Sequence, residues 1–332
     1  MHVLTVASVS YLPLADIMFE SLRAHHPELT PVLLIPDVTR ARLDALRQQG
    51  LDKFAELLCV EDLGLDFLEA ARSYYSALEF CSALKVLGTA HILKTESACL
   101  FLDPDMVIMD RLDAVLDAQD PILVTPHVLA PLPEDGHAPD SLEMCGAGFV
   151  NGGVFRASAG APALSWLVSK ARARWFVAPQ LGMYADQLWL SALPFLFPQT
   201  RLLREPAINV AYWNLHERPL RQENGRILLQ SGEPLRLFHF SGFSRPSNGR
   251  LTRHSDRRFG AETDRIVAQL VKDYEAKLEA TSLRWGHLRG DIPFNADPLP
   301  VRLERAADLL GDARLRLPKA GFGARLRALF GD

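Results

Sequence analysis

The stretch Ala98-Cys99-Leu100-Phe101-Leu102-Asp103-Pro104-Asp105 decides the fold. Its first five residues are almost all apolar, which is typical of a strand buried on both faces of a parallel sheet. Two carboxylates follow immediately, and Pro104 fixes the backbone between them. Because ligands of parallel α/β sheets bind beyond the carboxyl ends of the strands, we expect Asp103 and Asp105 to lie at a binding site.

Strand and helix signals alternate on the N-terminal side of this stretch. We expect strands at residues 2–7, 31–35 and 57–60, because each is a short apolar run. Helices are expected at residues 14–26, at residues 39–49 between a Thr39 cap and Gly50, and in two pieces at residues 65–90. This order predicts an α/β fold with a mostly parallel sheet flanked by helices.

The pattern becomes less regular after residue 105. Short strands are expected at residues 107–109, 122–124, 149–156 and 238–240, and helices at residues 161–176, 186–195 and 261–278. Residues 131–139 are rich in Pro, Gly and Asp, which favours a loop of the kind that covers a site. An irregular, Arg-rich segment is expected after residue 278.

The composition excludes several classes of protein. With 48% hydrophobic residues and a net charge of −4, the 332-residue chain is neither disordered nor a coat for nucleic acid. Its apolar stretches fall far short of the roughly 20 residues that span a bilayer. The N-terminus is typical of a strand rather than a signal peptide, and the four cysteines lack CxxC spacing. We therefore expect a cytoplasmic protein with buried free thiols.

Two motifs favour a site for a cation and a diphosphate. Asp103 and Asp105 could both reach one Mg²⁺ or Mn²⁺, although a plain surface turn is the alternative. In residues 238–246, His239 could be a further ligand of that cation or a satisfied core histidine. Gly242 would let the backbone approach a phosphate closely, and Arg245 could donate two hydrogen bonds to it.

Two further motifs fit a polyhydroxylated ligand. Two glycines interrupt the strand at residues 150–155, which indicates either a bulge or a ligand that crosses close to the backbone. Asp186 and Gln187 stand at the start of a helix, where Asp186 could be a cap or could face such a ligand together with Gln187.

These motifs, in the order DxD, NGG, DQ and HFxGxxRP, resemble those of the GT-A-fold glycosyltransferases. The closest resemblance is to the retaining family 8 enzymes and their bacterial lipopolysaccharide relatives, over residues 1–250. It implies a Rossmann-like catalytic domain with a donor site in residues 1–110 and an acceptor-side half in residues 111–250. Residues 251–332 would be a helical C-terminal extension. The implied donor is a nucleotide sugar, a UDP-sugar in most relatives, held with Mn²⁺ or Mg²⁺.

The resemblance also implies a role for individual residues. It implies metal ligation by Asp103, Asp105 and His239, phosphate binding by Gly242 and Arg245, and donor contacts by Lys85, Asn151 and Gly153. Asp186 and Gln187, under the sugar ring, are the implied catalytic residues, and Gln187 would stabilise positive charge at the anomeric carbon. The base and ribose would bind at Ala7, Ser8 and Tyr11. Two features depart from the family pattern. No acidic residue lies near the end of the first strand, and the usual Lys-Pro-Trp is Arg245-Pro246-Ser247. Membership of a sister family, in which the stereochemistry could differ, is therefore an alternative.

The stereochemistry is expected to be retention, because no carboxylate other than Asp186 stands in the context of a base. Inversion is the alternative, with His216 or Glu217 as the base. Residues 211–218 are dense in aromatic and polar side chains, which indicates either an acceptor platform or a packed turn. Its candidate residues are Tyr212, Trp213, Asn214, His216 and Glu217.

Two other functions are weaker alternatives. A sugar nucleotidyltransferase would need a Gly-rich basic loop after the first strand, which residues 7–11 lack. A non-catalytic nucleotide-sugar-binding protein would not need the full ligand set. Residues 315–330 alternate basic and apolar side chains, which favours either peripheral contact with the inner face of the cytoplasmic membrane or packing on the core. A membrane contact would suit a lipid-linked acceptor better than a soluble glycan.

Overall fold

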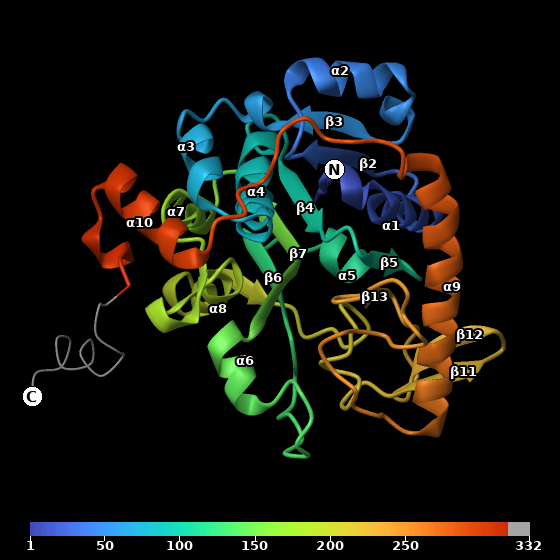
Figure 1. Ribbon diagram of the computed structural model, residues 1–332. Helices are drawn as coiled ribbons and strands as arrows, with labels where there is room; N and C mark the ends of the chain where they lie inside the picture. Colours follow the sequence, from blue (N-terminus) through green and yellow to red (C-terminus); the bar gives the residue numbers. More distant parts are fainter. Residues whose placement is uncertain (318–332) are drawn as a thin grey trace, which may run out of the picture.

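The computed structural model describes residues 1–317, which form an α/β fold around one seven-stranded sheet (Figure 1). The strand order is β10-β6-β7-β4-β1-β2-β3. The strands are β1 (His2–Val6), β2 (Thr30–Ile35), β3 (Glu56–Cys59), β4 (Ala98–Leu102), β6 (Ile122–Pro126), β7 (Val150–Ser158) and β10 (Thr200–Leu202). Only β7 runs antiparallel to its neighbours β4 and β6. The predicted fold class, a mostly parallel sheet flanked by helices, is confirmed.

Helices cover both faces of this sheet. They are α1 (Leu12–His25), α2 (Arg40–Gln48), α3 (Phe67–Tyr74), α4 (Ala77–Ile92), α7 (Pro162–Ala171) and α8 (Gln187–Leu196). In β1, Leu4 and Val6 enter the core under α4 and α7, and Val3 enters the core under α1 and α2. The apolar run of β4 divides in the same way, so the strand is buried on both faces as its composition predicts.

Local sequence signals fix several helix ends. The Thr39 hydroxyl accepts a hydrogen bond from the Arg42 amide at the start of α2, and Gly50 adopts a positive φ of 89° after its end. The helix predicted in two pieces is interrupted before Ser76, whose side chain and that of Glu79 form a capping box for α4. These predictions are confirmed.

The second half of the chain differs from prediction in several details. β5 (Met106–Ile108) pairs antiparallel with β13 (Leu237–His239) outside the main sheet. The loop at residues 131–139 leads into an unpredicted helix, α6 (Ser141–Ala147), which an Asp140 capping box begins. The helix predicted to reach residue 176 ends at Ala171. The remaining elements are α5 (Asp113–Leu116), β8 (Val177–Ala178), β9 (Met183–Tyr184), β11 (Leu220–Glu223) and β12 (Arg226–Leu229).

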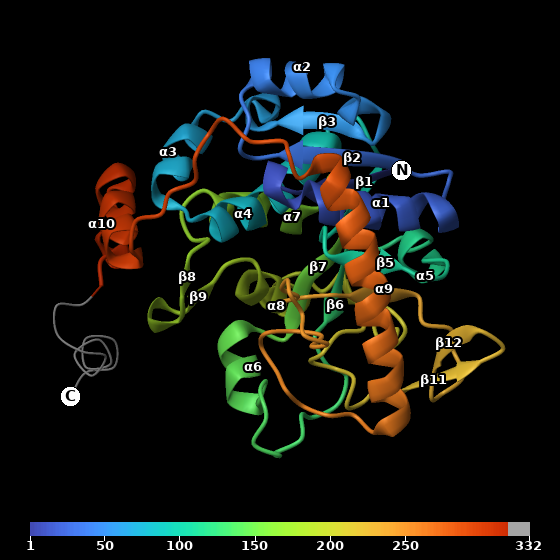
Figure 2. The same ribbon diagram turned by 45° about the vertical axis from the view of Figure 1, so that its right-hand side comes forward.

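A long helix, α9 (Ala261–Trp285), runs along one side of the molecule and lies against α1 (Figures 1 and 2). It continues past the predicted end at residue 278. The buried Asp16 carboxylate of α1 accepts hydrogen bonds from Arg284 Nη1 at 2.6 Å and Trp285 Nε1 at 2.7 Å. This contact joins the end of α9 to the N-terminal half of the chain.

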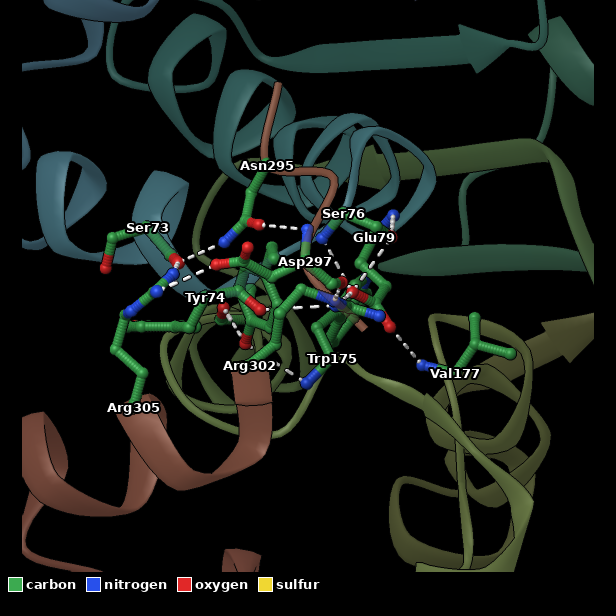
Figure 3. A network of polar contacts seen from close by, with 12 residues as sticks. Ser73, Tyr74, Ser76, Glu79, Trp175, Val177, Asn295, Asp297, Arg302 and Arg305 are labelled. Carbon is green, nitrogen blue, oxygen red and sulfur yellow. Dashed lines mark hydrogen bonds and ion pairs between the residues drawn. The ribbon is translucent and has the colours of Figure 1, made fainter. Parts of the chain in front are cut away.

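The segment predicted to be irregular contains a helix, α10 (Leu299–Leu310), which docks on α3 and α4 (Figure 3). Arg302 reaches the buried Glu79 carboxylate and the Tyr74 carbonyl oxygen. The expected irregular segment is therefore wrong at this point, whereas the helical C-terminal extension that the resemblance implies is confirmed. Leu303, Ala306 and Ala307 of α10 also pack on the apolar core. Most of the basic segment at residues 315–330 lies outside the described residues, so its membrane contact stays a prediction.

Two findings bear on the compartment prediction. Within residues 1–317, no helix is both long and apolar enough to cross a bilayer. All four cysteines are free thiols, but Cys145 is exposed rather than buried, because it lies on the outer side of the unpredicted α6.

Candidate active site

Two carboxylates and an imidazole meet at the carboxyl end of β4. Asp103 follows β4 and Asp105 precedes β5, while the pairing of β5 with β13 sets His239 opposite Met106. His239 Nε2 lies 3.1 Å from Asp105 Oδ1 and 3.9 Å from Asp103 Oδ2. One ligand atom from each residue falls within 4.8 Å of the others. The structure therefore brings together the three residues expected to bind the metal.

A chain of hydrogen bonds fixes the tautomer of His239. The Gly153 backbone amide donates to Asn151 Oδ1 at 2.9 Å, which identifies that atom as the oxygen. Asn209 must then offer its Nδ2 to the same oxygen, at 3.0 Å, so its Oδ1 faces His239 Nδ1, also at 3.0 Å. Nδ1 therefore carries a proton, and Nε2 is the ring nitrogen that faces the carboxylates and is placed to ligate a metal.

Lys85 joins the metal-ligand cluster to the start of α8. Its Nζ lies 3.1 Å from Asp103 Oδ1, 3.1 Å from Asp186 Oδ2 and 3.2 Å from the Gly152 carbonyl oxygen. Burial alone would lower the pKa of the Lys85 ammonium, but the two carboxylates outweigh burial and raise it. Asp186 makes no capping hydrogen bond to α8, so its side chain serves the Lys85 ion pair instead.

The cluster has more negative charge than its own residues compensate. Three carboxylates surround one ammonium, which leaves two net negative charges when His239 is neutral. Burial and the neighbouring Asp105 raise the pKa of Asp103 against the effect of Lys85, whereas His239 lowers that of Asp105 despite burial. Carboxylate oxygens and an imidazole nitrogen are ligands that suit Mn²⁺ or Mg²⁺, so the residues fit a divalent cation.

The glycines of β7 make room for side chains of the site. A β-carbon on Gly152 would lie 1.8 Å from Asp186 Oδ2, and one on Gly153 would lie 2.8 Å from His239 Cε1. The register between β6 and β7 also shifts between Val124 and Thr125, which is the bulge that the sequence offered as an alternative. The two glycines therefore serve both the bulge and the close approach of the site residues.

A cleft of about 490 Å³ opens beside this cluster. Four predicted site residues line it, namely Asn151, Gln187, Tyr212 and Trp213. Sequence reasoning missed other lining residues: His127, Glu143, Ser241 and His254. The only available signal was the loop at residues 131–139, since Ala138 and Pro139 form part of the wall.

The residues expected at the phosphates do not line this cleft. Gly242 has a φ of +72°, and a β-carbon there would lie 2.2 Å from His254 Cδ2, so the close approach is made by the chain itself. Arg245 is exposed, and its Nη1 lies 3.4 Å from Ser282 Oγ on α9. Their phosphate contacts stay predictions.

The residues expected at the base and ribose lie at the carboxyl end of β1. Ala7 and Ser8 are buried, whereas Tyr11 is 52% exposed. An acidic residue, missed in the sequence, approaches from the end of β2: Asp37 Oδ1 accepts a hydrogen bond from the Val9 amide at 2.9 Å. Burial raises the pKa of this carboxyl. Its position directly after the second apolar strand was the available signal.

The expected acceptor residues divide into two groups. Tyr212 and Trp213 face the cleft, and the Trp213 ring packs edge-on against His127 and His239, with centroids 5.2 Å apart in each case. Tyr212 stacks on His254 with centroids 6.0 Å apart.

The other members of this segment hold the chain in place. The buried Asn214 donates to the His127 and Asn209 carbonyl oxygens. Glu217 accepts from the Leu129 amide at 2.8 Å and also pairs with Arg218 at 3.2 Å. Neither ring nitrogen of the half-buried His216 has a hydrogen-bond partner among residues 1–317.

Comparison with known proteins finds similarity to glycosyltransferases. No protein-family model matches the chain. A curated relative, the uncharacterized protein YfnF of Bacillus subtilis, is 33% identical over 85 residues, which span 26% of this chain and 28% of that protein. The match therefore covers little more than a quarter of the relative's length.

Several solved structures are similar in outline. The galactosyltransferase LgtC, in complex with donor and acceptor sugar analogs, is 16% identical with a TM-score of 0.47, over 83% of this chain and 100% of that chain. Mouse xyloside xylosyltransferase 1 is 15% identical with a TM-score of 0.42, over 72% and 96%. The glycosyltransferase GlyE of Streptococcus pneumoniae is 13% identical with a TM-score of 0.40, over 85% and 63%.

Proposed function

We propose that the chain is a metal-dependent glycosyltransferase of the GT-A type, which transfers a sugar from a nucleoside diphosphate sugar to an acceptor hydroxyl. The observation that carries the proposal is the cluster of Asp103, Asp105 and His239 at the carboxyl end of β4, beside a cleft of about 490 Å³. The uncompensated charge of this cluster calls for a divalent cation. A diphosphate in turn needs such a cation to bind next to carboxylates.

Asp103, Asp105 and His239 would hold Mn²⁺ or Mg²⁺, which stabilises negative charge on the departing diphosphate when bound. Lys85 supports this site from within the protein. Because its ammonium contacts both Asp103 and Asp186, it fixes the two carboxylates relative to each other. Arg245 is proposed to contribute a further positive charge at the phosphates.

Retention is proposed for the stereochemistry. Lys85 engages Asp186, and backbone amides with Arg218 engage Glu217, so neither carboxylate is free to act as a base opposite the leaving group. Glu143 is the exposed carboxylate that lines the cleft, and it accepts a hydrogen bond from the Asp140 amide at 3.1 Å. If the reaction inverts, Glu143 is the candidate base.

We propose the nucleotide base and the acceptor from the residues near the same site. The base is proposed to be uracil, bound at Ala7, Ser8 and Tyr11, with UDP as the leaving group. The aromatic wall of Tyr212 and Trp213 suits a glycan, since sugar faces stack on aromatic rings. A lipid-linked glycan is the alternative acceptor, and peripheral contact through the C-terminal basic segment would suit it.

The test is a screen of nucleotide sugars for Mn²⁺-dependent hydrolysis, because hydrolysis needs no acceptor. We expect one donor to be cleaved and its nucleoside diphosphate to raise the melting temperature with Mn²⁺. Asp105→Asn should lose both effects, whereas Asp117→Asn, at an exposed position, should keep them. If no nucleoside diphosphate shifts the melting temperature, the donor-site assignment is wrong. Nucleotide binding without any hydrolysis or transfer would favour a non-catalytic binding protein.

The anomeric configuration of the product tests the stereochemistry. We expect NMR of the first-formed product to show the configuration of the donor, and Glu143→Gln to retain turnover. The opposite configuration, together with loss of turnover in Glu143→Gln, would establish inversion.

A further inference from the structure

His127 is a buried histidine in the cleft that the proposed function does not use. It follows β6, is 6% exposed, and lines the same cavity as Asn151 and Gln187. Its backbone amide donates to the Phe149 carbonyl oxygen at 2.8 Å, which holds it beside Gly148.

The start of α8 packs closely against this position. A β-carbon on Gly148 would lie 2.9 Å from the Gln187 carbonyl oxygen and 2.8 Å from Ser191 Oγ. Ser191 Oγ also donates to the Gln187 carbonyl oxygen at 2.6 Å and accepts from the Val150 amide at 3.0 Å. The backbone of Gln187 is therefore fixed against β7, and its side chain lies on the side of the cleft that holds His127.

The hydrogen-bond chain that sets the tautomer of His239 also sets that of His127. Since Asn151 Oδ1 accepts from the Gly153 amide, its Nδ2 is the atom 3.2 Å from His127 Nε2. Nε2 must therefore accept, and in the neutral ring the proton lies on Nδ1. Burial and then the charge of His239 lower the pKa of His127 to about 4, so the ring is neutral near pH 7.

The protonated Nδ1 still lacks a hydrogen-bond partner at normal distance among the described residues. The Gly148 carbonyl and the Gln187 side chain are the nearby polar groups that favour a proton on this ring. A buried N–H group without a partner is costly, so a small rotation of the Gln187 side chain that supplies an acceptor would be favourable.

We propose that His127 is a positioning residue, whose Nδ1–H orients the carboxamide of Gln187 in the cleft. The orientation of the His127 ring is in turn fixed by the hydrogen bonds that run from His239 through Asn209 and Asn151. The role in sugar transfer rests on the proposed function, in which Gln187 faces the transferred sugar. The hydrogen bonds that link these residues are independent of the proposed function.

The first test measures the order of the Gln187 side chain and needs no substrate. In ¹⁵N-labelled protein, Gln187→Ala identifies the side-chain amide signals by their loss, and heteronuclear relaxation reports their mobility. We expect an ordered amide in the wild type, a mobile one in His127→Phe, and an ordered one again in His127→Gln, which can both accept from Asn151 and donate to Gln187. His91→Phe, a half-buried histidine on α4, is the control and should change nothing. An ordered Gln187 in His127→Phe would overturn the proposal.

The second test separates binding from turnover with the donor found in the hydrolysis screen. We expect His127→Phe to lower kcat about 100-fold, the loss typical of a misplaced group, with Mn²⁺ and nucleoside diphosphate affinities unchanged within about twofold. His127→Gln should recover most of the loss. An unchanged kcat despite a mobile Gln187 would refute the positioning role. If the wild type cleaves no donor, the proposed function fails, and the relaxation measurement still decides the contact between His127 and Gln187.

Discussion

Two of the largely buried charge clusters among residues 1–317 differ in how completely their charges are compensated. At the end of β4, three carboxylates meet one ammonium, and the Nε2 atom of His239 faces two of the carboxylates. At the start of α4, a single carboxylate, Glu79, meets a single guanidinium, Arg302 (Figure 3).

Both carboxylate oxygens of Glu79 have hydrogen-bond partners within the protein. Glu79 Oε1 accepts from the Val177 amide at 2.7 Å, while Oε2 accepts from the Ser76 amide at 2.8 Å and from Arg302. These contacts join α4, β8 and α10, and leave nothing for a ligand to supply.

The difference separates a structural role from a binding role. Breaking a compensated buried pair leaves a bare charge and destabilises the fold. Removing one carboxylate from an uncompensated cluster relieves repulsion between like charges. The protein then loses affinity for a cation rather than stability of the fold. Each of the following predictions tests one side of this contrast.

Asp105→Asn should have the largest effect on turnover. We expect Mn²⁺-dependent hydrolysis to fall at least about 10³-fold, because the charge that stabilises the leaving diphosphate is lost with the metal. The free energy of unfolding of the metal-free protein should not fall, because one repulsive charge is removed. Hydrolysis rates and urea denaturation in a chelator measure the two quantities. A large loss of stability would mean that Asp105 has a structural role rather than a binding role.

Glu79→Ala should have the reverse effects of Asp105→Asn: it should lower stability and leave metal binding unchanged. We expect it to lower the free energy of unfolding by about 3 to 5 kcal/mol, because Arg302 is left buried without its partner. Affinity for Mn²⁺ per folded molecule should be unchanged. Urea denaturation of the two single variants and of Glu79→Ala with Arg302→Ala gives the coupling between them. Additive effects would contradict the paired-charge interpretation.

Stability should depend on pH through His127. Its folded pKa of about 4 lies below the ordinary 6.5, so between these values the unfolded chain binds a proton that the folded chain does not. Stability therefore rises with pH across this window, by about 3 kcal/mol from this group between pH 4 and pH 7. His127→Gln should remove that part of the slope in chelator-treated protein. An identical slope in both proteins would show that His127 is not buried in its neutral form.

Metal binding should stabilise only the uncompensated cluster. At 100 times its Kd, Mn²⁺ should raise the free energy of unfolding by about 2.7 kcal/mol. Asp103→Asn should abolish this increment, whereas Glu79→Gln should keep it on a lower baseline. If Mn²⁺ stabilises both variants equally, it binds elsewhere on the protein.

The sequence predicted the parts of the structure that depend on local patterns. The strands β1 to β4 are short apolar runs between turn residues, and the cap at Thr39 acts within one helical turn. The metal cluster was predicted for a similar reason, because Asp103 and Asp105 are fixed to the end of β4 by chain connectivity. For His239 the sequence alone left two roles open, a metal ligand or a core histidine, and the resemblance to a family implied the first.

The parts that were missed depend on tertiary contacts. Asn209 and His127 are single polar residues without a motif, and they become recognisable only when the β5–β13 pairing brings their segments together. The ion pair between Arg302 of α10 and Glu79 was missed because the two residues are 223 residues apart in the sequence. Periodicity cannot report such a contact.

This separation along the chain has a consequence during synthesis. At about 5 to 20 residues per second, Arg302 leaves the ribosome roughly 10 to 45 s after Glu79. Over that interval the nascent sheet can form, but the carboxylate at the start of α4 has no cation to pair with. The N-terminal half of the chain therefore waits for almost the last described helix before Glu79 is paired with a cation, and a chain interrupted before α10 would keep this carboxylate without its partner permanently.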